Sequence, residues 1–179
     1  VTWGKPDSGG DSNQVSDKLA TGVTEIVGTS RAYAALKQDG SVVSWGETAE
    51  GGDSAVVADK LKANVKKLFS THEAFVALKR DGSVVTWGSL YPGGNNSQIA
   101  ERLRFGVMDI IANHYSGFAA LKSNGSVIAL TRDLEKGLVV KEIKSGVKAI
   151  FPAGDGFIAV KTDGSPIYWE DWKSISEHV

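Results

Sequence analysis

The stretch ALKQDGSVVSWG at residues 35–46 returns as ALKRDGSVVTWG at residues 77–88, an interval of 42 residues. Each copy ends in a V-[ST]-W-G tetrapeptide, and the tryptophans of three such tetrapeptides keep the same interval: Trp3, Trp45 and Trp87. A fourth copy runs through Leu130, where the tryptophan is lost, and a fifth ends at Trp169. Self-similarity at a fixed period of about 20–50 residues is typical of solenoids and propellers. The repeat therefore decides the fold.

Each repeat contains an Asp-Gly or Asn-Gly pair between alternating apolar segments, which is the strongest short-range signal for a β-hairpin. We therefore expect four hairpins, at residues 32–45, 74–87, 117–130 and 156–169. We expect type I′ turns, in which both central residues have positive φ, because Gly, Asn and Asp tolerate that conformation best. The four pairs are Asp39-Gly40, Asp81-Gly82, Asn124-Gly125 and Asp163-Gly164.

A further strand is expected upstream of each hairpin, because the segments there are short and rich in β-branched residues. These segments are residues 23–27, 65–69, 107–111 and 147–151. Before the first three lies a Gly-rich corner, followed by apolar residues four to five apart, which predicts one or two helical turns. Asp11, Asp53 and Asn95 are candidate N-caps of these turns. One carboxylate per corner is too few for Ca²⁺, so no metal site is expected there.

The last unit departs from the pattern, as expected of a capping repeat. It lacks the Gly-Gly corner and has residues 132–137 instead, and Pro166 there predicts an edge strand. Residues 1–3 match the final strand of a hairpin whose first strand is missing. We expect a fragment of a longer repeat array, and the alternative is that this strand pairs with another partner. The expected fold is mainly β: a partial or open β-propeller of four blade-like units of about 42 residues. The expected single repeat domain spans residues 1–179, with units 4–45, 46–87, 88–130 and 131–169 and a tail, 170–179.

The pattern V-x-x-I … A-[FY]-x-A-L-K-x-D-G-S-V-x-x-W-G resembles the regulator-of-chromosome-condensation repeat, and most closely the short bacterial repeats of the β-lactamase-inhibitory propeller. All four hairpins match. The resemblance implies a β-propeller, usually of seven blades, whose main function is to bind other proteins. Four units cannot supply seven blades, so an open arc, a truncated propeller and a dimer of arcs all remain open. The Gly-Gly-Asp-Ser corner departs from the family, and the nucleotide-exchange role of the nuclear member is not expected.

The composition excludes several classes of function. Hydrophobic residues make up 41% and charged residues 23%, which is typical of a globular chain. The net charge of −1 gives no long-range attraction to nucleic acid, so no nucleic-acid partner is expected. No apolar run approaches the length of about 20 residues that spans a bilayer, so membrane insertion is not expected. The chain has no cysteine, which excludes disulfides and thiolate ligands.

Residues that differ between the copies are the better candidates for function, because the blade does not need them. If the inter-strand loops share one rim, such residues form a mixed aromatic and polar surface with the chemistry of binding hot spots. The alternative is that they are ordinary exposed loop residues. The repeated tryptophans are expected to pack between blades rather than to form a stacking platform for sugars or bases. The candidate binding residues are Arg31, His72, Tyr91, His114 and Tyr115.

No motif for catalysis is found: His72 is not followed by a second histidine four residues on, and neither a G-x-S-x-G elbow nor a phosphate loop occurs. We therefore expect no enzyme, no cofactor and no metal, although a triad assembled from distant loops stays open. The predicted function is a protein-binding module of a larger bacterial surface or secreted protein. Two alternatives are a carbohydrate-binding repeat and the targeting domain of a toxin or effector. A protein partner is expected first, a glycan second, and association of copies through open blade edges is left open.

Overall fold

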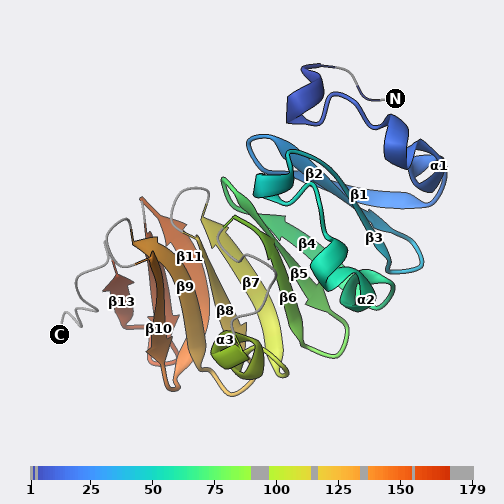
Figure 1. Ribbon diagram of the computed structural model, residues 1–179. Helices are drawn as coiled ribbons and strands as arrows, with labels where there is room; N and C mark the ends of the chain where they lie inside the picture. The colour runs from blue at the N-terminus through green and yellow to red at the C-terminus, as the bar shows by residue number, and fades with distance from the viewer. Residues whose placement is uncertain are drawn as a thin grey trace. The chain divides into compact units, whose positions relative to one another are not determined.

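The computed structural model describes residues 2, 4–89, 97–113, 117–133, 137–154 and 156–169. The chain forms two compact units, residues 1–104 and 105–179. The described strands form antiparallel sheets of three or four strands, two sheets in each unit (Figure 1). None of the helices in this part of the chain is long and apolar enough to cross a membrane. The mainly β fold of blade-like repeats is confirmed.

The first unit contains two copies of the same three-stranded sheet. The first has the order β1-β2-β3 and the second has the order β4-β5-β6, each built from an upstream strand and a hairpin. The expected hairpins and upstream strands are confirmed to within a residue or two. The bounds are β1 (Val23–Gly28), β2 (Ala32–Lys37), β3 (Val42–Gly46), β4 (Val65–Ser70), β5 (Ala74–Lys79) and β6 (Val84–Gly88).

The second unit repeats this plan with one addition. Its first sheet has the order β10-β9-β8-β7 and its second the order β11-β12-β13. The added strand, β10, lies where the Gly-Gly corner is missing, and it pairs with β9 without interruption from Gly137 opposite Asp133 to Ile143 opposite Val127. Pro166 begins β13, an edge strand among the described strands, as predicted. The bounds are β7 (Val107–Asn113), β8 (Gly117–Lys122), β9 (Val127–Asp133), β10 (Gly137–Ile143), β11 (Val147–Ala153), β12 (Gly156–Lys161) and β13 (Pro166–Trp169).

The prediction of type I′ turns is wrong. Gly40 has a φ of 79°, but among the described residues Asn64 is the one non-glycine with positive φ, so Asp39 lacks it. The Gly40 N–H donates to Lys37 O and the Lys37 N–H to Ser41 O, which is a type I turn followed by a glycine bulge. The Asp39 carboxylate accepts the N–H and the hydroxyl of Ser41, at 2.9 and 2.7 Å. The serine after the pair therefore selects this turn, because it holds the aspartate in place.

The first two Gly-rich corners precede short helices, as expected, and the third, with the candidate N-cap Asn95, lies outside the described residues. Asp11 accepts the N–H of Asn13 and Asp53 accepts that of Ala55, each one residue earlier in the chain than a formal N-cap. Both carboxylates satisfy a free N–H at a helix start, so the capping role is confirmed with this shift. The helices of the first unit are η1 (Pro6–Ser8), η2 (Asn13–Val15), α1 (Ser16–Leu19), η3 (Thr48–Glu50), η4 (Ala55–Val57), α2 (Ala58–Leu61) and α3 (Ser97–Arg102).

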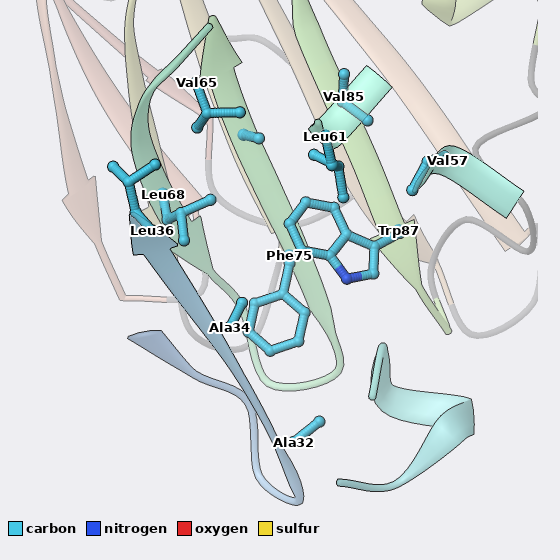
Figure 2. Packing of buried hydrophobic residues seen from close by; sticks show 11 residues of the cluster. Ala32, Ala34, Leu36, Val57, Leu61, Val65, Leu68, Phe75, Val85 and Trp87 are labelled. Atoms are coloured by element: carbon cyan, nitrogen blue, oxygen red, sulfur yellow. The ribbon is translucent and has the colours of Figure 1, made fainter. Parts of the chain in front are cut away.

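The hydrophobic core of the first unit lies between its two sheets. We call the face of the second sheet that packs on the first sheet its near face, and the opposite face its far face. The equivalent faces of the other sheets take the same names. The far face of the first sheet presents Ala32, Ala34 and Leu36. Figure 2 shows the ring of Phe75, on the near face of the second sheet, beside Ala34, with the ring of Trp87 next to Phe75 in the same cluster. The expectation that a repeated tryptophan packs between blades is confirmed at Trp87.

The second unit is built on the same principle. The far face of the β7–β10 sheet presents Ala119, Leu121 and Ala129. These side chains pack on Ile150 and Phe157 of the near face of the β11–β13 sheet. Small residues on one blade and large residues on the next give dense contact, because the larger side chains fill the space that the alanines leave.

Candidate functional site

Arg31 and His72 occupy equivalent inter-strand loops of the first unit, between β1 and β2 and between β4 and β5. Each loop is closed by a threonine at its start: the Ala32 N–H donates to the Thr29 hydroxyl at 3.0 Å, and the Ala74 N–H to the Thr71 hydroxyl at 3.2 Å. When a side-chain hydroxyl accepts the hydrogen bond of a backbone N–H three residues later, it takes the place of a backbone carbonyl and favours a tight turn. The loops are therefore held in defined conformations at one end of their sheets.

A hydrogen bond joins the two loops. The N–H and the hydroxyl of Ser30 both donate to the backbone oxygen of His72, each at 3.0 Å. The bond links residues 42 positions apart, one full repeat. The structure thus brings Arg31 and His72 onto one surface. We define the rim as the loops 29–31 and 71–73 together with Glu47 and Ser89, the residues that directly follow β3 and β6.

The rim carries side chains of both charge signs. The Arg31 guanidinium lies 3.4 Å from the Glu47 carboxylate, and the Glu47 N–H donates to Arg31 O. At the equivalent place in the second sheet, the Ser89 hydroxyl donates to the Glu73 carboxylate at 2.6 Å. His72 Nδ1 lies 3.9 Å from the same carboxylate. The side chains of Arg31 and His72 are nearly half exposed, so both can contact a partner.

A hollow of about 380 Å³ adjoins the rim at Ser89. Its floor includes Val57 and Trp87, and at its edge Val56 is 76% exposed. Sequence reasoning missed Val56, although a comparison of the copies carries the signal: the equivalent residues are Gln14 and Gln98. An apolar side chain at a position that is otherwise glutamine is not needed by the blade. The remaining lining residues are Thr48, Ala49, Asp53, Ser54 and Gly88.

A second groove of the first unit, of about 480 Å³, is bordered by Lys18, Lys37 and Lys62. The ammonium of Lys37 donates to Lys18 O at 2.6 Å, and that of Lys62 lies 2.6 Å from Asp59. This ion pair lowers the pKa of Asp59 and raises that of Lys62. Two of the three ammonium groups thus have partners within the chain, and the groove is a weaker candidate than the rim.

The other predicted site residues, Tyr91, His114 and Tyr115, lie outside the described residues. In the second unit, Asn113 is the last residue of β7, and its side-chain amide donates to Gly154 O, just after β11, and to Gly156 O, at the start of β12, both at 2.9 Å. Within the described ranges, no group of three or more His, Asp or Glu side chains is placed to hold a metal ion.

Comparison with protein-family models and with curated proteins found no match for the sequence. Among solved structures, human WBSCR16 superposes with a TM-score of 0.58 at 14% identity, over 82% of this chain and 46% of that one. Yeast RCC1 (Prp20) bound to Kap60 gives 0.53 at 16% identity, over 82% of this chain and 43% of that one. Prp20p from Saccharomyces cerevisiae superposes with a TM-score of 0.52 at 16% identity, over 82% of this chain and 45% of that one.

At these identities the likeness shows the fold alone. The sheets have the fold of the blades in RCC1-type β-propellers, and the chain spans less than half the length of each of these three structures. The resemblance to the repeat family is thereby confirmed at the level of the fold.

Proposed function

We propose that this chain is a non-catalytic, protein-binding propeller module, and that the rim and its hollow form the binding surface. The observation that carries the proposal is the pair of hydrogen bonds from Ser30 to His72 O, which fixes two loops of different blades against each other. A preorganised surface loses less conformational entropy on binding than free loops do. Loops held by a rigid scaffold are also the usual site of recognition.

The chemistry of the surface fits a protein segment. The rim offers a cation at Arg31 and anions at Glu47 and Glu73, beside an apolar hollow edged by Val56. A peptide that inserts one apolar side chain into the hollow and pairs its charges along the rim would match both features. A glycan would match less well, because the aromatic floor residue Trp87 is buried and offers no exposed ring face for stacking.

The solved structures support a protein partner indirectly. One structure of Prp20 is a complex with Kap60. The other comes from a study of the binding of Prp20p to Gsp1p and histones. We further propose, from the repeat ALKxDGSVVxWG, that the chain is akin to the short bacterial repeats of this family and belongs to a larger surface or secreted protein.

Site-specific photo-crosslinking tests the rim. A photoreactive residue is placed at position 31, 56 or 72 of the whole chain and exposed to proteins of the source organism. We expect the same crosslinked protein from all three positions, and weaker capture in the Arg31→Glu variant. Position 80 is the matched control, because Arg80 is exposed and follows the opposite end of β5. Crosslinks that are equal at 80 and 31, or a glycan-array signal lost in Arg31→Glu, would overturn the proposal.

A further inference from the structure

The groove of about 480 Å³ in the first unit runs beside β3, the strand at the end of the first sheet. Its floor is formed by residues 42–44, which are half-buried. Val15 and Lys18 of the first corner form one wall, and the second corner with α2, residues 52–62, forms the other (Figure 1). All lining residues lie between positions 15 and 62, so both walls and the floor belong to the described part of the first unit.

Charge is unevenly distributed along this groove. Three cations border it: Lys18, Lys37 and Lys62. The Lys37 N–H donates to the residue directly before β3, and its ammonium reaches Lys18 O, so these two lysines lie where β3 begins. The one carboxylate in the lining is that of Asp53, whose neighbour Ser54 is hydrogen-bonded to Ser44 in the middle of β3. The groove therefore attracts an anion most strongly at the end where β3 begins.

The three ammonium groups can pair with an external anion. Lys18 contributes its backbone oxygen to the bond with Lys37, so its own exposed ammonium is not used there. Lys37 uses one of its three donor hydrogens in that bond. The pair of Lys62 with Asp59 joins side chains that are 73% and 90% exposed, and such pairs contribute little to stability because water screens them. Carboxylates of a ligand can thus pair with these lysines without breaking a strong contact.

The floor and one wall add small apolar side chains. Val42 and Val43 of the floor are half-buried, and Ala55 and Ala58 of the wall are exposed. A peptide with small apolar side chains would cover this strip and gain free energy from the burial. A polyphosphate or a nucleic acid would leave the strip uncovered, and its charge would be repelled by Asp53. The lining therefore favours a peptide over a polyanion.

We propose that the groove binds an acidic peptide segment of a partner protein. The segment lies along β3, with small apolar side chains on Val42 and Val43 and with carboxylates at the end that Lys18 and Lys37 border. The groove is a second binding site beside the rim. It shares Asp53 and other corner residues with the rim hollow, but none of the three lysines borders that hollow.

Selection of random phage-displayed peptides on the whole chain tests the proposal, with the affinity of each selected peptide measured by fluorescence anisotropy. We expect peptides in which small apolar residues adjoin aspartate or glutamate. Lys18→Glu should weaken their binding about tenfold, because it replaces an attraction by a repulsion. Ala58→Trp should weaken it as well, because the larger side chain fills the groove without a change of charge. Both positions are exposed, so the fold tolerates the two changes.

Lys66→Glu is the matched control: it makes the same change of charge at an exposed position that does not border the groove, and the affinity should not change. Arg31→Glu on the rim should also leave the affinity unchanged, so this proposal and the proposed function can fail separately. Circular dichroism verifies that each variant is folded.

Four results would overturn the proposal. The first is a selection that yields no acidic peptide, including one in which inorganic polyphosphate binds instead and is lost in Lys18→Glu. The second is full binding in both Lys18→Glu and Ala58→Trp. The third is an equal loss in Lys66→Glu, which would reduce the effect to general attraction by positive charge. The fourth is a loss confined to Arg31→Glu, which would assign the peptides to the rim.

Discussion

Trp87 donates its indole N–H to the backbone oxygen of Gly51 at 3.1 Å, and Trp45 makes the same bond to Gly9 one repeat earlier at 3.0 Å. The bond links the last strand of a hairpin to the corner that precedes its sheet, 36 residues before. The ring also stacks on Phe75, with centroids 5.2 Å apart. In each repeat of the first unit, the tryptophan therefore joins the last strand of the hairpin to the corner and to the preceding strand of its own sheet.

Replacing Trp87 with phenylalanine should lower the free energy of unfolding by about 1–3 kcal/mol, because a buried carbonyl loses its donor. The same change at Trp45 should cost less. Its stacking partner Tyr33 is 37% exposed, whereas Phe75, the partner of Trp87, is fully buried, so the smaller ring gives up less buried contact at position 45. Chemical denaturation of the two variants measures the difference. Equal losses would contradict the account.

Gly52→Ala should be severely destabilising, by more than about 2 kcal/mol, because overpacking against fixed backbone cannot relax. An added Cβ would overlap the carbonyl group of Gly46, and the equivalent Gly10 meets Gly4 in the same way. Gly22→Ala is the control: its φ is +75° but the new Cβ meets only the Lys37 side chain at 3.6 Å. It should cost the left-handed penalty alone, about 1–2 kcal/mol. A smaller loss at Gly52 than at Gly22 would refute this close approach.

Acid should weaken the hairpin turns that contain aspartate. Hydrogen bonds from Ser41, Ser83 and Ser165 lower the pKa of Asp39, Asp81 and Asp163. A carboxyl group whose pKa is lower in the folded state than in the unfolded state stabilises the fold at pH values above its unfolded pKa, which is near 4. This stabilisation is lost as the pH falls through the folded-state pKa.

The third hairpin provides the control variant for this prediction. Asn124 makes the same bonds to Ser126, at 3.0 and 2.7 Å, and cannot titrate. A variant with asparagine at positions 39, 81 and 163 should therefore keep the turns and lose less stability between pH 6 and pH 3 than the wild type. Thermal melts at both pH values check this. An identical pH dependence in the two proteins would show that these bonds do not favour the charged form.

Asn113 should tolerate alanine better than aspartate. Its buried amide donates to Gly154 O and Gly156 O, so alanine leaves two carbonyls without this donor. Each buried group that loses its partner costs about 1–3 kcal/mol. Aspartate costs more, because a carboxylate would face two acceptors at hydrogen-bond distance. Denaturation of the two variants gives the order, and a more stable Asn113→Asp would contradict it.

Much of the fold could be predicted from the sequence, because the repeat copies the same signals four times. The Asp-Gly pairs located the hairpins, and the β-branched segments located β1, β4, β7 and β11. The turn type was mispredicted because the Asp-Gly pair alone does not distinguish a two-residue turn from a three-residue turn with a bulge. The contacts of Ser41 with Asp39 decide between them, and they depend on the backbone that they stabilise.

The additional strand and the binding surface were harder to predict. Residues 137–143 carry no repeat signal, and β10 forms because the long edge of β9 offers it a partner. The sequence placed Arg31 and His72 in equivalent loops, but their connection through Ser30 is a contact between sheets that no local pattern encodes. Val56 was missed because the hollow beside it exists only once η4 lies against β6.

The account depends most on the claim that consecutive sheets pack near face on far face, so that the near face is buried in the second sheet and exposed in the first. The chain has no cysteine, so single-cysteine variants at Ile26 and Leu68 report on equivalent positions of these faces without background. The measurement is the rate of thiol labelling in dilute solution. We predict that Ile26→Cys reacts at the rate of an exposed thiol and that Leu68→Cys is strongly protected. Equal rates at the two positions would contradict the account.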